Sequence, residues 1–223
     1  YNDLLKWKEE DLLTPLMVIG ARQIGKTYII KEFCEKEFPS YIYVNLKERL
    51  EVVNIFENTE DNYESKMQKF FSIVGHVPSD NEIIFFDEVQ ESEHLISLLK
   101  AINEDKHPYK VICAGSLLGV RLHRMSTSFP VGKVRMINMY PMTFEEFLMN
   151  VTTKETIDMI KEHYLSNEPL DNTMHNHFLK LYRDYLIIGG MPESIKNYIE
   201  SDKDVLRINK NILNDIISSY KED

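Results

Sequence analysis

Hydrophobic positions in the first part of the chain form short apolar runs separated by stretches with helical spacing. Uninterrupted apolar runs of strand length are typical of strands that are buried on both faces of a parallel sheet. The pattern predicts strands over residues 16–19, 41–44, 83–86, 111–114 and 134–139, and helices near residues 4–7, over 26–38, within 46–74 and around 95–102. Strands that alternate with helices predict an α/β fold with a parallel sheet of about five strands, covered by helices on both faces.

The pattern changes after Pro141. Thr143 and Glu146 have the spacing of a helix-capping box, in which the hydroxyl and the carboxylate each accept a hydrogen bond from the other residue's backbone N–H. From there onward the spacing is helical, with breaks near residues 167–169 and at Gly189-Gly190. The sequence therefore predicts an α/β core over residues 1–142 and an all-helical unit over residues 143–223.

The charge balance bears on the choice of partner. The chain has 26 Lys and Arg residues against 36 Asp and Glu residues, which gives a formal net charge of −10. A negative field repels phosphate backbones, so charge does not indicate DNA as a partner, although a local basic patch would still permit it. No apolar run approaches the roughly 18 residues that span a bilayer, so no membrane contact is expected.

Two further features concern the setting of the protein. Cys34 and Cys113 lie in predicted core elements, and buried free thiols in a reducing cytoplasm are favoured over a disulfide. We therefore expect a cytoplasmic location. The chain begins with Tyr1 rather than Met, which indicates a piece of a longer protein.

The strongest chemical signal is the octapeptide Gly20-Ala21-Arg22-Gln23-Ile24-Gly25-Lys26-Thr27, which matches G-x-x-x-x-G-K-[ST] at every fixed position. The glycines let the backbone curl so that successive amides bind an anion, and the following helix adds its N-terminal partial positive charge. Lys26 is predicted to reach the β- and γ-phosphates, and the Thr27 hydroxyl to bind Mg²⁺. Chance would place this octapeptide in about one chain of this length in a hundred.

Two carboxylates follow the predicted third strand. Asp87 and Glu88 come directly after residues 83–86, so both emerge at the carboxyl end of a parallel strand, where ligands of such folds bind. Asp87 is predicted to hold the water shell of Mg²⁺, and Glu88 to polarise the attacking water. Apolar runs that end in acidic residues are common, so this pair alone is a weak signal. Together with the phosphate loop it becomes a strong indication of a nucleotide-hydrolysing site. The adjacent glutamate favours hydrolysis over transfer to a small molecule.

The choice of nucleotide rests on a missing motif. GTPases usually carry N-K-x-D for guanine, and the nearest string, Asn209-Lys210-Asn211-Ile212, lacks the aspartate, so ATP is favoured. A metal site at His175 and His177 is not expected. Side chains two apart on a helix point in different directions, and no acidic or cysteine ligands accompany these histidines.

With these motifs placed, the chain resembles the prokaryotic AAA-type P-loop ATPases of the AAA_14 group, which precede a DUF4143 domain. The resemblance rests on residues 20–27, 86–90 (Phe-Asp-Glu-Val-Gln), 114–119 (Ala-Gly-Ser-Leu-Leu-Gly), 129–132 (Phe-Pro-Val-Gly), 140–147 (Tyr-Pro-Met-Thr-Phe-Glu-Glu-Phe) and 189–193 (Gly-Gly-Met-Pro-Glu). It implies an AAA+ core sheet, then a helical lid and the start of a winged-helix-like region. The DUF4143 part is expected to be absent from the chain.

The resemblance also assigns roles to two motifs. It gives Ser116 a sensor role, in which the hydroxyl contacts the γ-phosphate or the attacking water; a helix cap before Leu117 is the alternative. It places Gly190, Met191 and Pro192 against the adenine; the alternative is a helix that ends at a glycine and a new helix that opens at a proline.

The family's usual arginine after Gly132 is replaced by Lys133. Arg121, Arg124 and Arg135 therefore stay as candidates for an arginine that acts on the transition state, although an ordinary surface or salt-bridge role is favoured for each.

Together these features predict an ATP hydrolase whose cycle moves the helical unit. Lys26, Glu88 and Ser116 are the predicted catalytic residues, Thr27 and Asp87 the predicted metal ligands, and residues 20–27 with Met191 and Pro192 the predicted nucleotide site. A slow nucleotide-gated switch or recruitment module is one alternative, and a DNA-associated ATPase acting through a winged-helix region is another. A homo-oligomer and an unidentified protein client are compatible with each.

Overall fold

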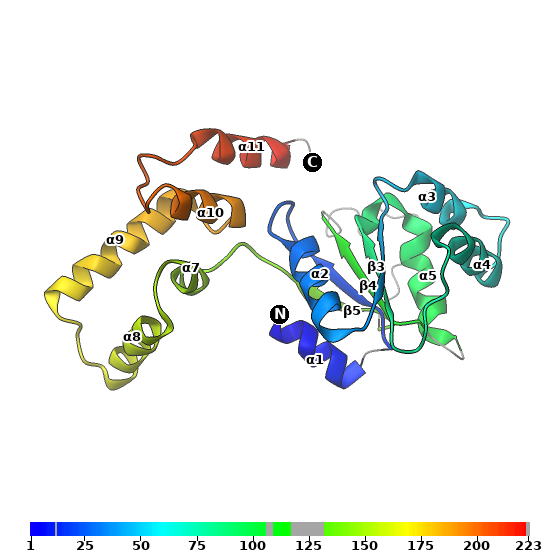
Figure 1. The fold of residues 1–223 in the computed structure, drawn as a ribbon, viewed down its shortest axis with the longest axis horizontal. Helices are drawn as coiled ribbons and strands as arrows, with labels where there is room; N and C mark the ends of the chain where they lie inside the picture. Colours follow the sequence, from blue (N-terminus) through cyan, green and yellow to red (C-terminus); the bar gives the residue numbers. More distant parts are fainter. Residues whose placement is uncertain (12, 106–108, 117–131, 222–223) are drawn as a thin grey trace. The chain divides into compact units, whose positions relative to one another are not determined.

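The computed structural model follows the α/β order that the sequence predicts (Figure 1). The structure describes residues 1–11, 13–105, 109–116 and 132–221. The chain divides into two compact units, Tyr1–Met139 and Tyr140–Asp223, against an expected boundary after residue 142.

The first unit is built on a five-stranded parallel sheet with the strand order β2-β3-β4-β1-β5. Its strands are β1 (Leu16–Ile19), β2 (Tyr41–Asn45), β3 (Ile83–Asp87), β4 (Val111–Gly115) and β5 (Arg135–Asn138). Its helices are α1 (Asn2–Asp11), α2 (Lys26–Glu37), α3 (Leu50–Glu57), α4 (Tyr63–Val74), the short 3-10 helix η1 (Val89–Glu91) and α5 (Glu93–Glu104). The predicted parallel sheet is confirmed.

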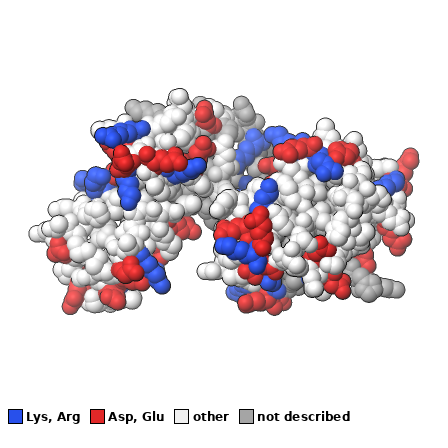
Figure 2. All heavy atoms as spheres, viewed as in Figure 1, with Lys and Arg blue, Asp and Glu red and all other residues white. Residues whose placement is uncertain are grey.

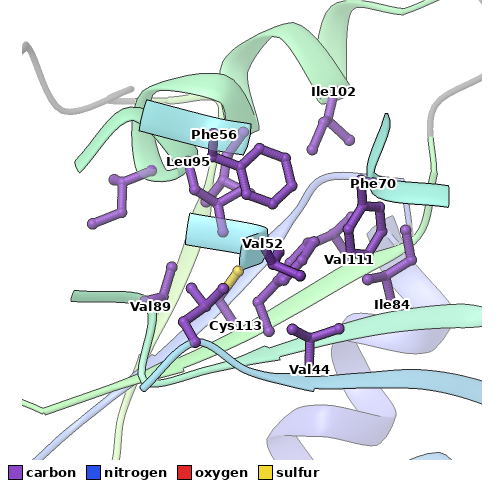
Figure 3. Packing of buried hydrophobic residues seen from close by; sticks show 14 of the residues in the cluster. Val44, Val52, Phe56, Phe70, Ile84, Val89, Leu95, Ile102, Val111 and Cys113 are labelled. Atoms are coloured by element: carbon purple, nitrogen blue, oxygen red, sulfur yellow. The ribbon is translucent and has the colours of Figure 1, made fainter. Parts of the chain in front are cut away.

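The strand side chains alternate between two hydrophobic cores, one on each face of the sheet. Ile84 packs with residues of α3, α4 and α5 (Figure 3). Phe86 belongs to the same cluster, whereas Ile83 and Phe85 pack with residues of α1 and α2. Because both faces are covered, β3 has no polar position before its last residue. Cys34 and Cys113 are buried free thiols, as predicted.

Three strands extend one residue further than their apolar runs predict. β2 continues to Asn45, β3 to Asp87 and β4 to Gly115. Asn45 pairs in parallel register with Asp87, so the backbone ladder continues where the side chains become polar. Asp87 is therefore held by a strand rather than by a loop, which fixes the direction of its carboxylate.

The second unit contains only helices within its described residues. They are α7 (Phe144–Val151), α8 (Lys154–Ser166), α9 (Asn172–Ile188), α10 (Pro192–Glu200) and α11 (Lys210–Lys221). The capping box is confirmed: Glu146 N–H donates to Thr143 Oγ1 at 3.2 Å, and Thr143 N–H donates to Glu146 Oε2 at 2.7 Å. Both predicted helix breaks are confirmed, because α8 ends before Asn167 and α9 ends before Gly189.

None of the helices in the described part of the chain has the length and apolar character needed to cross a membrane.

Candidate nucleotide-binding site

Strand order brings three predicted site segments to one edge of the sheet. β4 lies between β1 and β3 and is parallel to both. The phosphate loop follows β1, Ser116 follows β4, and Asp87 ends β3. All three segments therefore lie at the carboxyl ends of adjacent strands, where open parallel sheets bind their ligands.

Two glycines shape the phosphate loop. A Cβ atom on Gly20 would lie 2.2 Å from the carbonyl oxygen of Met139 and 2.5 Å from Cδ1 of Ile24, so a larger residue does not fit there. Gly25 precedes α2 with φ 92°, a left-handed conformation that favours glycine. Ile24 is buried between them and anchors the turn. The loop thus leads from a strand into the N-terminus of a helix, the arrangement that binds phosphate.

Lys26 is buried at the start of α2, and its ammonium group lies on the loop. Nζ donates to the carbonyl oxygens of Gly20, at 2.9 Å, and Ala21, at 2.6 Å. Burial lowers the pKa of Lys26, while the negative charges of Glu88 and Asp87 act in the opposite direction. A bound phosphate would offer this ammonium a charged partner in place of the two carbonyls.

The phosphate loop and the acidic pair meet through one hydrogen bond. Thr27 Oγ1 donates to Asp87 Oδ2 at 2.8 Å, although the two residues are 60 positions apart in the chain. Hydroxyl and carboxylate oxygens are ligands that suit Mg²⁺, which usually takes few protein ligands and completes its shell with phosphates and water. Within the described ranges no group of three or more His, Cys, Asp or Glu is placed to hold a metal. The donor set here therefore fits Mg²⁺ bound together with a nucleotide.

Asp87 is buried and accepts hydrogen bonds on both carboxylate oxygens. Oδ2 accepts from Thr27 and from the phenol of Tyr43, at 3.1 Å, and Oδ1 accepts from the backbone N–H of Glu88, at 3.0 Å. Burial raises the pKa of Asp87, and the charge of Glu88 adds to that rise, whereas the hydrogen bonds oppose it. Sequence reasoning missed Tyr43. The alternation of β2 places it on the same face as Tyr41, but nothing in the sequence indicates its partner.

Glu88 and Ser116 are joined by Gln90, which sequence reasoning also left without a role. Glu88 is half-buried with a left-handed backbone, φ 55°. Gln90 Nε2 donates to Glu88 Oε2, and Gln90 Oε1 accepts from the backbone N–H of Ser116 at 3.2 Å. The Ser116 hydroxyl is buried and finds no hydrogen-bond partner among the described residues. A buried hydroxyl without a partner is uncommon, and the position of Ser116 at the carboxyl end of β4 is compatible with a hydrogen bond to a ligand there.

The arginine candidates fall into two groups. Arg121 and Arg124 lie outside the described residues, as does the segment that would test Ser116 as a helix cap. Arg135 begins β5, opposite Leu16 at the amino end of β1, and forms an ion pair with Glu10 at 3.1 Å. That edge of the sheet is opposite to the one at which Thr27 and Asp87 meet. Arg135 therefore does not serve the phosphate loop of its own chain.

Met191 and Pro192 lie in the second unit. α9 ends before Gly189, which has φ 73°, and α10 opens at Pro192 with Met191 as its N-cap residue. A glycine that ends one helix and a proline that opens the next are thus confirmed at this point. The contact of Met191 and Pro192 with an adenine stays a prediction.

Comparison with solved structures shows similar folds at low identity. Drosophila ORC bound to DNA is 12% identical with a TM-score of 0.50, over 99% of this chain and 67% of that chain. C. elegans PCH-2 is 12% identical with a TM-score of 0.44, over 97% of this chain and 62% of that chain. A variant of Thermotoga maritima RuvB is 14% identical with a TM-score of 0.48, over 98% of this chain and 64% of that chain. The chain thus spans 62% to 67% of the length of these neighbours.

Sequence comparison identifies the family. A search of curated proteins gave no match. The family model AAA_14, described as an AAA domain, matches residues 14–148, which is more than half of the chain. This segment contains the phosphate loop, the acidic pair and Ser116. The chain therefore belongs to the AAA_14 family of AAA-type P-loop ATPases.

Proposed function

We propose that this protein binds ATP together with Mg²⁺, hydrolyses it, and uses the nucleotide state to move its helical unit. The hydrogen bond from Thr27 to Asp87 carries the proposal. It joins the two motifs that the chemistry needs, and it supplies a hydroxyl and a carboxylate at the carboxyl edge of the sheet. A phosphate loop without that partner would support binding of an anion but not metal-dependent hydrolysis.

Each side chain has a defined part in the proposed reaction. Mg²⁺, when bound, neutralises charge on the phosphates. Lys26 moves its ammonium from the Gly20 and Ala21 carbonyls to the phosphates and stabilises the charge that develops on them. Glu88 orients the attacking water and accepts its proton, and the Ser116 hydroxyl contacts the terminal phosphate.

The adenine contact belongs to the same proposal. Met191 is buried at the start of α10, and Pro192 is half-buried beside it. An apolar pair at a helix N-terminus suits the flat face of a base. A preference for ATP over GTP in competition binding would support this part, and equal affinity would remove it.

Turnover and binding in two variants test the assignment. Glu88→Gln should keep the affinity for ATP and lose most turnover, because general-base help is worth about 10²–10⁴ in rate. Lys26→Ala should weaken ATP binding itself, measured by calorimetry. Equal turnover in Glu88→Gln and the parent, or unchanged ATP affinity in Lys26→Ala, would contradict the respective role.

A nucleotide-gated switch with slow turnover is the second candidate. The position of Arg135 favours it, since this arginine is engaged with Glu10 at the edge opposite to the phosphate loop. In such a module the conformation is the output, and ATP and ADP must bind the two conformations with different affinity.

Action on DNA is the least supported of the three functions. Described basic side chains lie among acidic ones on the face drawn in Figure 2, and the net charge is −10. The fold is similar to that of Drosophila ORC, whose structure was solved with DNA, at 12% identity. Turnover measured with and without duplex DNA at physiological salt decides the matter, and stimulation by DNA would support a DNA-associated ATPase.

A further inference from the structure

Gln90 is a buried polar residue, so hydrogen bonds must offset the free-energy cost of removing its amide from water. It lies in η1, directly after the acidic pair, and is 6% exposed. A buried amide costs free energy unless its donor and its acceptor are both paired. Nothing in the proposed reaction uses Gln90 directly, yet both ends of its amide contact residues that the reaction does use.

The two contacts connect adjacent strand ends. Nε2 donates to Oε2 of Glu88, which follows β3, and Oε1 accepts from the N–H of Ser116, which follows β4. We propose that Gln90 is a positioning residue that holds the Glu88 carboxylate and the Ser116 backbone in a fixed relation, so that both groups meet the terminal phosphate together. The inference rests on the proposed ATPase function, because Glu88 and Ser116 act there on water and phosphate.

The chemistry of the amide explains why glutamine suits this position. The Glu88 carboxylate needs a donor and the Ser116 N–H needs an acceptor, and an amide offers one of each. A carboxylate at position 90 would still accept from Ser116 but would place a second negative charge beside Glu88. An apolar side chain of similar length would serve neither group.

The Ser116 hydroxyl is the group that a ligand would contact in this arrangement of Glu88, Gln90 and Ser116. It is 1% exposed and has no hydrogen-bond partner in the described part of the chain, so it stays available to a ligand. Its position follows from the backbone N–H that Gln90 holds. Glu88, in turn, has a left-handed backbone with φ 55°, so its side chain is aimed by the backbone and then fixed by the amide.

Kinetics of two variants of the full chain test the proposal. Gln90→Met should lower kcat for ATP about ten- to hundred-fold and leave KM for ATP and the affinity for ADP within about two-fold, since Glu88 and Ser116 lose their support and the phosphate loop keeps its own contacts. Gln90→Glu should lose at least as much although it keeps the acceptor for Ser116, because it replaces the donor to Glu88 by a second negative charge beside that carboxylate. Gln68→Met, at an exposed glutamine in α4, is the matched control and should behave as the parent.

A spectroscopic measurement makes the test independent of turnover. The side-chain NH₂ resonances of Gln90 are assigned by their loss in Gln90→Met, and they should shift in Glu88→Ala. Parent-like kcat in Gln90→Met or Gln90→Glu, loss of ADP binding together with turnover, or unmoved resonances in Glu88→Ala would each overturn the proposal. A parent that hydrolyses no ATP would instead overturn the proposed function, and the resonance shift would then decide the Gln90 contact by itself.

Discussion

The Asp87 carboxylate forms hydrogen bonds with three separate parts of the site. It receives hydrogen bonds from α2, through Thr27, from β2, through Tyr43, and from the backbone N–H of Glu88. Burial raises the pKa of Asp87, because the ionised carboxylate loses its hydration, and these hydrogen-bond donors offset part of that free-energy cost. A buried carboxylate with a raised pKa beside a phosphate loop is typical of a functional site rather than of a structural ion pair.

Tyr43 is predicted to support Asp87 as a Mg²⁺ ligand. Burial and the nearby Asp87 raise the pKa of the Tyr43 phenol, so it remains a donor at neutral pH. Tyr43→Phe removes that donor and keeps the ring, which packs on Phe85 with centroids 5.2 Å apart. A hydrogen bond of this kind contributes about 0.5–1.5 kcal/mol, so the Mg²⁺ concentration for half-maximal ATP binding should rise about two- to ten-fold.

Calorimetric ATP titrations at a series of Mg²⁺ concentrations measure this shift, and ATP binding without Mg²⁺ should be unchanged. Tyr41→Phe is the control on the same face of β2, because its phenol donates to Glu35, at 3.3 Å, rather than to Asp87. The same Mg²⁺ dependence in Tyr43→Phe and Tyr41→Phe would show that Tyr43 is only a packing residue.

At the scale of elements, the sequence predicts what local periodicity determines. β3 is predictable because both of its faces are buried, and α7 because Thr143 and Glu146 cap each other. Strand ends are less predictable, since polarity marks the start of a loop one residue before the backbone ladder ends. The contacts of Tyr43 and Gln90 were not predictable at all, because each depends on which strands are neighbours in the sheet.

Gly190 shows how an element boundary can be fixed by close backbone approach. The N–H of Met142 donates to the Gly190 carbonyl at 2.7 Å, and a Cβ on Gly190 would lie 2.1 Å from the Met142 carbonyl oxygen. The phenol of Tyr185 donates to that same oxygen at 2.8 Å. The segment before α7 is thus joined to the α9–α10 boundary within the helical unit.

Gly190→Ala should destabilise the helical unit by about 1–3 kcal/mol, because the added methyl group displaces Met142 and breaks its hydrogen bond. Gly189→Ala measures backbone strain without a clash: Gly189 has open space around the position of a Cβ, but its φ of 73° and ψ of −174° lie in a region almost restricted to glycine, so strain of about 1–3 kcal/mol opposes it. Urea unfolding compares the two variants. A loss well below 1 kcal/mol in Gly190→Ala would show that Met142 yields without cost.

At the scale of the whole molecule, the family and the fold follow from sequence, while the assembly does not. The hydrophobic pattern predicts the α/β fold, the octapeptide and the acidic pair predict its site, and the family model matches residues 14–148. The sequence does not predict which arginine, if any, acts on the transition state. Lys133, at the expected position, forms an ion pair with Glu104 at 3.2 Å, and Arg135 pairs with Glu10. Neither pair brings a cation to the phosphate loop, so we propose as a hypothesis to be tested that Arg121 or Arg124 of a second copy of the chain supplies the arginine.

Turnover per chain should consequently rise with protein concentration, since an arginine supplied in trans contributes about 10³–10⁵ in rate once copies assemble. Arg121→Ala or Arg124→Ala should lose that rise. Adding Glu88→Gln chains, which keep their arginines but lack the base, should restore turnover to whichever arginine variant is inactive. Constant turnover per chain across concentrations, with no rescue in the mixture, would contradict a trans arginine. It would favour the slow nucleotide-gated switch, in which the bound nucleotide sets the conformation and hydrolysis only resets it.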